Sequence, residues 1–208
     1  QTSLSFRFDA QRISDQDDLT FLFRWNYAEE DHEMTKRNLF LSLEYDYSVY
    51  NELEKEQIDT VYESTYLYLS TEFYSDPFRN IDYRTISGLG AGFKPISEKT
   101  LLFSVEGGLA YLLEENTDGT DDGYFTTRIN SKVKWKPWET VSVEDSLTLY
   151  PSLEESNIKM RNEASISWKM GGGWGLNFSA ITDFDSDPAS DAEKTDHHFL
   201  VSLQFIFK

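Results

Sequence analysis

Apolar and polar residues alternate along most of the chain, most clearly at residues 39–49. One set of alternate positions is apolar (Leu39, Leu41, Leu43, Tyr45, Tyr47 and Val49), and the other is largely polar (Phe40, Ser42, Glu44, Asp46 and Ser48). Successive side chains of a β-strand point to opposite faces, so the segment predicts a strand with one apolar face. The alternation returns at residues 125–135, 158–170 and 199–207. Strands of about ten residues with two such faces are typical of outer-membrane β-barrels.

The pattern predicts eleven strands in one domain that spans residues 1–208. They fall at residues 2–12, 19–27, 37–49, 58–73, 83–93, 100–113, 124–135, 140–150, 157–170, 174–185 and 196–207. Turn-like connections (14–18, 50–57, 94–99, 136–139 and 171–173) alternate with mostly longer, acidic ones (28–36, 74–82, 114–123, 151–156 and 186–195). Outer-membrane barrels have short periplasmic turns and longer extracellular loops. We therefore expect the acidic loops outside the cell and the last strand to end in the periplasm.

With the last strand ending in the periplasm, the first visible strand runs inward from the extracellular side. An even-stranded barrel with both ends in the periplasm then needs one more strand ahead of Gln1. The predicted fold is therefore all-β, an antiparallel up-and-down transmembrane β-barrel of twelve strands, eleven of them visible here. Ten strands remain the alternative if one predicted strand has been divided in two.

The alternation also assigns side chains to the two faces of the wall. We expect these residues to point outward: Leu19, Phe21, Phe23, Trp25, Tyr27, Leu101, Phe103, Val105, Leu109, Tyr111, Trp174, Leu176, Phe178 and Ala180. Charged residues on the opposite positions are expected to point inward, and they include Arg7. The facing of the fourth strand stays open, because Tyr62, Tyr66 and Tyr68 alternate with Val61, Leu67 and Leu69.

Composition supports an envelope location more than any particular chemistry. The net charge of -18 argues against nucleic acid as a partner, because phosphates require a basic surface. The chain has no cysteine, so it has neither a disulfide nor a thiolate metal site. It has no run of 18 apolar residues, which excludes a transmembrane helix. Aromatic residues make up 15% of the chain and many lie near strand ends, as interfacial girdles require.

Three stretches resemble a known family. Asp82-Tyr83-Arg84-Thr85 leads into residues 88–93 (GLGAGF), residues 149–154 read LYPSLE, and residues 184–188 (FDSDP) precede residues 193–196 (EKTD). In this order and spacing they are similar to the salt-induced outer-membrane protein family, domain of unknown function 481, over essentially the whole chain. The resemblance implies a Gram-negative outer-membrane barrel under osmotic regulation, with no established catalytic residues. The chain departs from the family in lacking a further first strand and its Gly-Asn-Ser/Thr-Asp turn, and in Lys208 after Phe207.

The inward charges are the first candidate site. They are Arg24, Glu44, Glu106, Arg128, Lys132, Glu144, Arg161, Glu163 and Asp183. One interpretation is an ion path whose charges set selectivity. The other is a plug in which mutual salt bridges fill the lumen. Barrels of about eight strands are filled by side chains and those of about sixteen contain a channel, so twelve strands leave both interpretations open.

Other candidates have weaker support. The acidic loop residues Asp118, Asp121 and Asp122 are weak candidates for a divalent cation, since the spacing of a calcium loop is missing. Ser186, Asp185 and His198 are the only hydrolase arrangement that the strand pairing suggests, and their interpretation as ordinary loop and interface residues is strongly favoured. Gly88, Gly90 and Gly92 alternate on one face, which indicates a sharp bend or the close approach of lumen side chains.

The sequence therefore predicts a non-enzymatic outer-membrane barrel without a cofactor. Its role is structural, or it is a narrow channel for small solutes or ions linked to osmotic stress. The alternative is an interaction barrel that docks an outer-membrane protein through its wall or its acidic loops. The expected partners are outer-membrane lipid and lipopolysaccharide, the barrel-assembly machinery and such a docked protein.

Overall fold

The computed structural model describes residues 2–14, 16–30, 33–49, 65–154, 156–188 and 193–205. Eleven strands in this part of the chain form one sheet. They are β1 (Thr2–Ile13), β2 (Asp17–Glu30), β3 (Glu33–Ser48), β4 (Thr65–Asp76), β5 (Ile81–Ser97), β6 (Leu101–Asn116), β7 (Asp121–Trp138), β8 (Val141–Pro151), β9 (Ile158–Gly171), β10 (Trp174–Asp185) and β11 (Thr195–Phe205). A 3-10 helix, η3 (Pro77–Arg79), joins β4 to β5. None of the helices in the described residues is long and apolar enough to cross a membrane.

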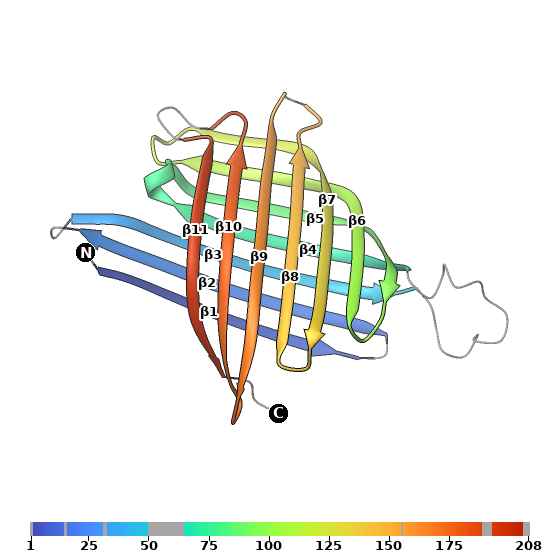
Figure 1. Cartoon of the computed structure of the whole chain (residues 1–208). Coiled ribbons are helices and arrows are strands. Elements are labelled where there is room, and N and C mark those ends of the chain that lie inside the picture. The colour runs from blue at the N-terminus through green and yellow to red at the C-terminus, as the bar shows by residue number, and fades with distance from the viewer. Residues whose placement is uncertain are drawn as a thin grey trace.

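Each strand pairs in antiparallel fashion with its neighbours in the chain, in the order β1 to β11. The sheet curls into a nearly closed barrel, with β8 to β11 at the front of Figure 1 and β1 to β5 behind them. The predicted all-β, antiparallel up-and-down fold is therefore confirmed. Among the described residues, β1 and β11 are the two edges of the sheet, and no ladder joins them. The chain reverses direction ten times between β1 and β11, so these two edge strands run in the same direction. The twelfth strand stays a prediction.

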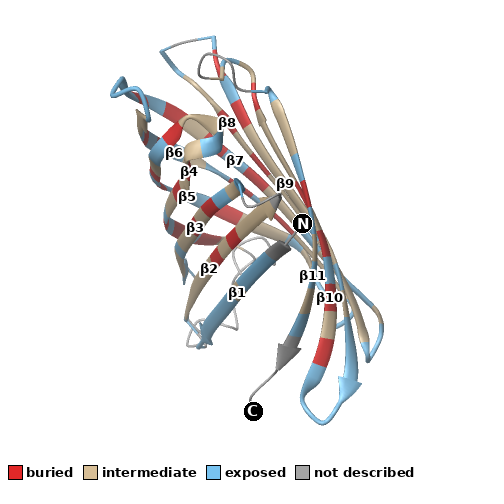
Figure 2. Cartoon of the chain, turned by 90° about the vertical axis from the view of Figure 1, so that its left-hand side faces the viewer, coloured by how far each residue is buried: buried red, intermediate tan, exposed pale blue. Residues whose placement is uncertain are grey.

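The alternation of faces is visible in the burial of the side chains (Figure 2). In β4, Tyr66 and Tyr68 are buried, whereas Leu67 and Leu69 are exposed. This settles the facing of these four residues, which the sequence left open, with the two tyrosines inside and the two leucines outside. Val61 and Tyr62 lie outside the described residues. Small apolar clusters lie among the polar residues inside the barrel, one around Leu112 and another around Phe40.

Several strands are longer than the sequence predicted. β2 and β3 extend to Glu30 and from Glu33 into the predicted loop 28–36, and β6 and β7 leave only residues 117–120 of the predicted loop 114–123. An antiparallel ladder needs only backbone hydrogen bonds, so hairpin arms continue past the point where the apolar pattern ends. β5 and β7 also run through Pro95 and Pro137, where shifts of register accommodate the missing N–H donors. The predicted turn 50–57 lies outside the described residues.

The glycines on β5 allow tyrosines to pack against the inner wall. A Cβ on Gly90 would lie 2.7 Å from the Tyr68 Oη and 2.6 Å from the Gly108 Cα, and one on Gly92 would overlap the ring of Tyr66. The predicted close approach of lumen side chains to these glycines is thus confirmed.

Candidate functional site

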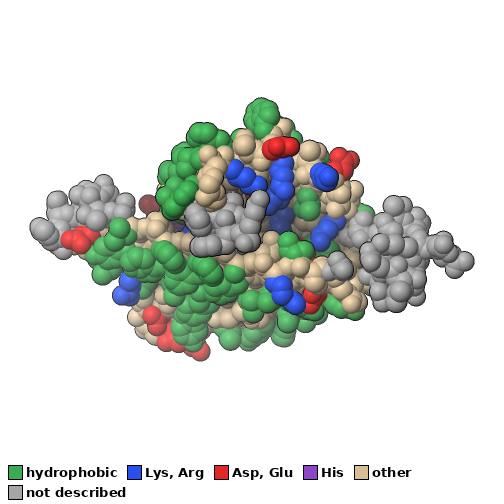
Figure 3. All heavy atoms as spheres, turned by 90° about the horizontal axis from the view of Figure 1, so that it is seen from below, with side chains coloured by type: hydrophobic (Ala, Val, Ile, Leu, Met, Phe, Trp, Pro, Cys, Tyr) green, Lys and Arg blue, Asp and Glu red, His purple; other side chains and the backbone are tan. Residues whose placement is uncertain are grey.

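The inside of the barrel contains most of the buried charged residues, and three groups of ion pairs lie at different depths. The loop-side end is the end of the barrel where η3 and the connection 117–120 lie and where β8 and β10 end, and the turn-side end is the opposite one. Seen from below, Lys and Arg side chains occupy the middle of the molecule and hydrophobic side chains gather on its outer surface (Figure 3).

The turn-side cluster consists of Glu44, Glu106, Arg128 and Lys132. Arg128 donates to Glu106 Oε2 at 2.6 Å and to Glu44 Oε2 at 2.7 Å. Lys132 Nζ lies 2.5 Å from Glu44 Oε1. Glu44 is on β3, whereas Arg128 and Lys132 are on β7, which is not its neighbour in the sheet, so the two pairs of Glu44 cross the lumen. Tyr66 donates to the remaining Glu106 oxygen at 2.7 Å, which fixes that carboxylate further.

The mid-lumen cluster consists of Arg7, Arg24, Arg161, Glu163 and Asp183. Arg24 on β2 donates to Glu163 Oε2 on β9 at 2.6 Å, and Arg7 on β1 forms an ion pair with the other oxygen of the same carboxylate. Arg161 lies 3.6 Å from Asp183. The Arg24 side chain is only 1% exposed, so its charge depends on Glu163 rather than on solvent. This cluster ties β1 and β2 to β9, across the edges that no ladder joins.

Phe40 packs between two members of the mid-lumen cluster. The guanidinium carbon of Arg161 lies 4.1 Å from the centre of the Phe40 ring, and that of Arg24 lies 5.6 Å from it. An aromatic face attracts a guanidinium and allows it to approach closely. Phe40 therefore holds two like charges in a small space, which explains its inward position among polar residues.

The loop-side cluster consists of Arg84, Glu114, Lys159 and Asp185. Arg84 on β5 pairs with Glu114 on β6 and donates to Asp185 on β10 at 3.2 Å, and Lys159 on β9 pairs with Asp185. Lys159 Nζ also lies 3.5 Å from Glu114 Oε2. Two cations and two carboxylates thus alternate, and the cluster joins opposite sides of the barrel near its mouth. A further bond that crosses the lumen runs from Tyr150 on β8 to Glu72 on β4, at 2.8 Å.

A small cavity lies between the mid-lumen and loop-side clusters. Its lining includes Phe40, Tyr74, Arg84, Tyr150 and Arg161. Its volume, counted as the space that the centre of a water molecule can occupy, is about 40 Å³. One water needs about 10–15 Å³ by this measure, so the cavity has room for only a few waters. Charged, aromatic and aliphatic side chains from both sides of the barrel therefore leave little space in this part of the lumen.

The structure brings eight of the nine lumen residues named from the sequence into the turn-side and mid-lumen clusters. Glu144 lies apart, near the turn-side end, where it pairs with Lys134 at 2.5 Å and both side chains are more than 40% exposed. Sequence reasoning missed the loop-side cluster. The alternating pattern does indicate this cluster in part, because Arg84, Glu114 and Lys159 occupy inward positions. The pattern nevertheless places Glu114 in the predicted loop 114–123.

The weaker candidates remain apart from these clusters. Asp118 Oδ1 accepts hydrogen bonds from the Thr120 hydroxyl and backbone N–H, at 2.6 and 2.9 Å, and these bonds lower the pKa of Asp118. Asp122 Oδ1 accepts from the Gly123 N–H at 3.0 Å. The described residues contain no group of three or more Asp, Glu or His side chains that could hold a metal ion, so divalent binding stays a prediction.

The hydrolase arrangement does not form a triad. Ser186 Oγ donates to Asn157 at 2.9 Å, while Asp185 belongs to the loop-side cluster. The His198 ring lies 2.9 Å from Asp196 and contacts Lys36. Each of the three side chains therefore contacts other partners rather than the other two members of the arrangement.

Comparison with known proteins gave one match. The family model described as "Protein of unknown function, DUF481" matches residues 1–207, which is nearly the whole chain. Neither the curated proteins nor the solved structures yielded a match. A match of this extent confirms the family that the three stretches predicted, and the chain belongs to the DUF481 family.

Proposed function

We propose that this protein is a non-enzymatic integral outer-membrane β-barrel whose lumen is closed by its own ion pairs. The observation that carries the proposal is that the clusters and the Tyr150–Glu72 bond join strands on opposite sides of the lumen at three depths. An open pore would leave such charges to water, whereas here each of them lies within ion-pair distance of an opposite charge in its own cluster. The role that fits is structural support of the envelope rather than conduction.

The outer surface supports the membrane location. Exposed apolar side chains such as Leu109, Phe125, Trp168, Phe178 and Leu203 occupy outward positions of β6, β7, β9, β10 and β11. A water-soluble protein rarely exposes so much contiguous apolar surface, and a bilayer would cover it. In this location the partners are outer-membrane lipid, lipopolysaccharide and the assembly machinery.

Conductance in a planar bilayer tests the closed lumen. The full-length mature protein, reconstituted at low and at high salt, is expected to show no discrete openings at any voltage. A variant that removes one carboxylate from each cluster, Glu44→Ala with Glu163→Ala and Asp185→Ala, is expected to conduct if it assembles, because its lumen loses links at all three depths. Cation-selective openings of the wild-type protein would instead support the narrow-channel interpretation.

A second test concerns location and orientation. An epitope inserted in the connection 117–120 should be labelled on intact cells, and one inserted at residues 139–140 should be labelled only after the outer membrane is opened. Recovery of the protein in the soluble fraction would contradict the membrane location. The link to osmotic stress comes from the family resemblance alone, and growth of a deletion strain at high salt tests it.

A further inference from the structure

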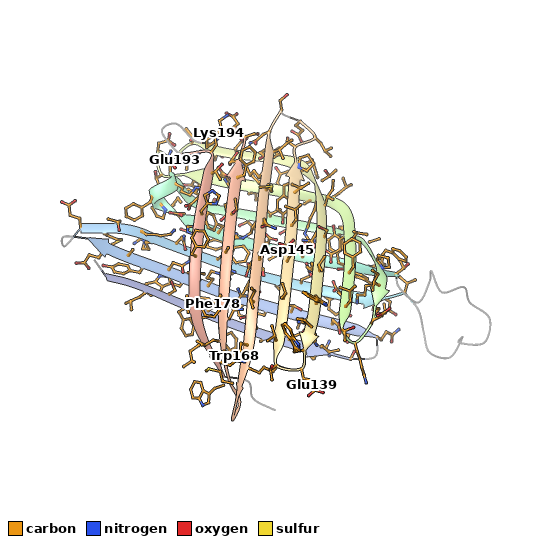
Figure 4. The ribbon with its side chains drawn as sticks, viewed as in Figure 1. Glu139, Asp145, Trp168, Phe178, Glu193 and Lys194 are labelled. Atoms are coloured by element: carbon orange, nitrogen blue, oxygen red, sulfur yellow. The ribbon has the colours of Figure 1, made fainter. Side chains whose placement is uncertain are left out.

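Asp145 is a charged residue near the middle of the outer wall. It is the fifth of the eleven residues of β8, at an outward position between Val143 and Leu147. On the neighbouring strands its opposite residues are Val133 and Ala164. Figure 4 shows it on the front wall, above Trp168 and Phe178 and below Glu193 and Lys194. Its side chain is exposed, so it points away from the lumen clusters.

The contacts of Asp145 leave its charge uncompensated. Asn162 on β9 donates its amide to Asp145 Oδ1 at 3.1 Å and also reaches the Ser146 carbonyl at 3.3 Å. Among the described residues, the ion pairs do not include Asp145. On the same wall, Thr182 and His197 form a second polar contact at 3.0 Å. By contrast, the outward side chains where residues 19–25 of β2 pair with residues 39–45 of β3 are only Leu, Phe, Trp and Tyr.

A carboxylate in this place conflicts with a lipid environment. Charged side chains at membrane depth pair with another charge or face a water-filled space, because hydrocarbon cannot solvate them. Asp145 faces neither the lumen nor a cation of its own chain. This step rests on the proposed membrane location, since an exposed Asp in water would need no partner.

We propose that the face formed by β8 to β11 docks a second integral membrane protein that presents a Lys or Arg to Asp145. Charge complementarity selects this occupant. A second copy of the chain fits less well, because the outward arginines of the described strands lie near strand ends. Arg12 pairs with Asp17, and Arg37 lies beyond the start of the β3–β4 ladder at Leu39. The small side chains of Ala164 and Ala180 beside Asp145 allow a partner to approach closely.

Photocrosslinking in native outer membranes tests the proposal with the full chain. A photoreactive phenylalanine analogue at Ala164 is expected to give one protein adduct, identified by mass spectrometry, and the same analogue at Leu43 on β3 is the control. Asp145→Asn keeps the hydrogen bond from Asn162 and removes the charge, so it should lower the adduct yield at least about tenfold. Exchanging the charges, with Asp145→Lys and an Asp in place of the cation on the crosslinked protein, should restore the adduct.

Three results would overturn the docking proposal. They are an adduct between two copies of this chain, adducts with lipid alone, and a protein adduct whose yield Asp145→Asn does not change. Membrane fractionation of the same samples separates this failure from that of the proposed function. Protein in the outer membrane without the expected adduct contradicts docking only, whereas protein outside the membrane contradicts the proposed location itself.

Discussion

Leu41 and Ser42 are adjacent in β3, and their side chains lie on opposite sides of the wall. Leu41 is opposite Phe23 and Phe73, whereas Ser42 is opposite Leu22 and Glu72 on the inner side. We expect Leu41→Arg to destabilise the folded barrel by about 2–4 kcal/mol, because lipid cannot solvate the guanidinium at this depth. Ser42→Arg should be tolerated, since Glu72 can accept the new charge. Urea unfolding in lipid vesicles measures both values.

Equal free energies of unfolding for these two variants would contradict the assignment of faces on β3. The comparison is matched, because the same side chain is introduced at neighbouring positions of one strand. If both variants failed to fold, we would conclude that β3 does not have one face toward lipid and the other toward the lumen.

Gly90 and Gly107 offer a second matched comparison at this scale. A Cβ at Gly90 would collide with Gly108 and the Tyr68 hydroxyl, whereas a Cβ at Gly107 would meet nothing within 4 Å. We expect Gly90→Ala to destabilise the barrel by about 1–3 kcal/mol, the usual range for overpacking. Gly107→Ala should be close to neutral. Thermal unfolding in detergent measures both, and a similar loss for the two variants would argue against close packing of Tyr68 on β5.

At the level of the strands, the sequence was sufficient for their order and for most of the faces, and the faces follow from a period of two that a single strand displays by itself. It did not predict the lengths of all connections, because the predicted loop 28–36 is a hairpin in which β2 reaches Glu30 and β3 begins at Glu33. It was insufficient in β4, because Tyr and Leu are both apolar enough for either side. The lengths of the hairpin arms were also missed, because backbone pairing needs no apolar residues there.

The partners of the lumen charges could not be predicted either. Alternation indicates that Glu44 and Arg128 point inward, but it does not indicate which strands face each other across the lumen. That depends on the curvature of the whole sheet and on the register of every ladder. The sequence pattern places Glu114 in a loop for the same reason that it predicts strands that are too short. The position of Glu114 in β6 depends on backbone pairing with the neighbouring strands, which the apolar pattern does not show.

The two edges of the sheet should differ measurably from its centre. β1 and β11 each have one side without a ladder, whereas β5 to β7 are paired on both sides. Amide protons on an unpaired edge exchange faster, because no hydrogen bond has to open. Hydrogen exchange followed by mass spectrometry on the chain 1–208 should show the least protection in β1 and β11. Protection there equal to that of β6 would indicate that another strand covers these edges.

For the whole molecule, the members of an ion pair that crosses the lumen should be coupled, so that the effect of replacing one on the free energy of unfolding depends on whether the other is present. Glu163→Gln removes the carboxylate that Arg24 and Arg7 share, and Arg24 is almost fully buried. We expect a loss of about 3–5 kcal/mol, the range observed when one partner of a buried pair is removed. The double variant Glu163→Gln with Arg24→Met should recover most of that loss. Urea unfolding in vesicles gives the comparison, and additive effects of the two changes would show that the pair is not coupled.

The ladders of this sheet join only strands that follow one another in the chain, which has a consequence for the order of folding. Hairpins can form one after another from local contacts, and local contacts form quickly. The pairs of Glu163 with Arg24 and Arg7 join residues 139 and 156 positions apart, so they can form only when the sheet has already curled. Until then the charged face of the sheet remains in contact with water. In the proposed outer-membrane location, the residues that close the lumen are thus the ones that keep the unfinished sheet hydrated before it inserts.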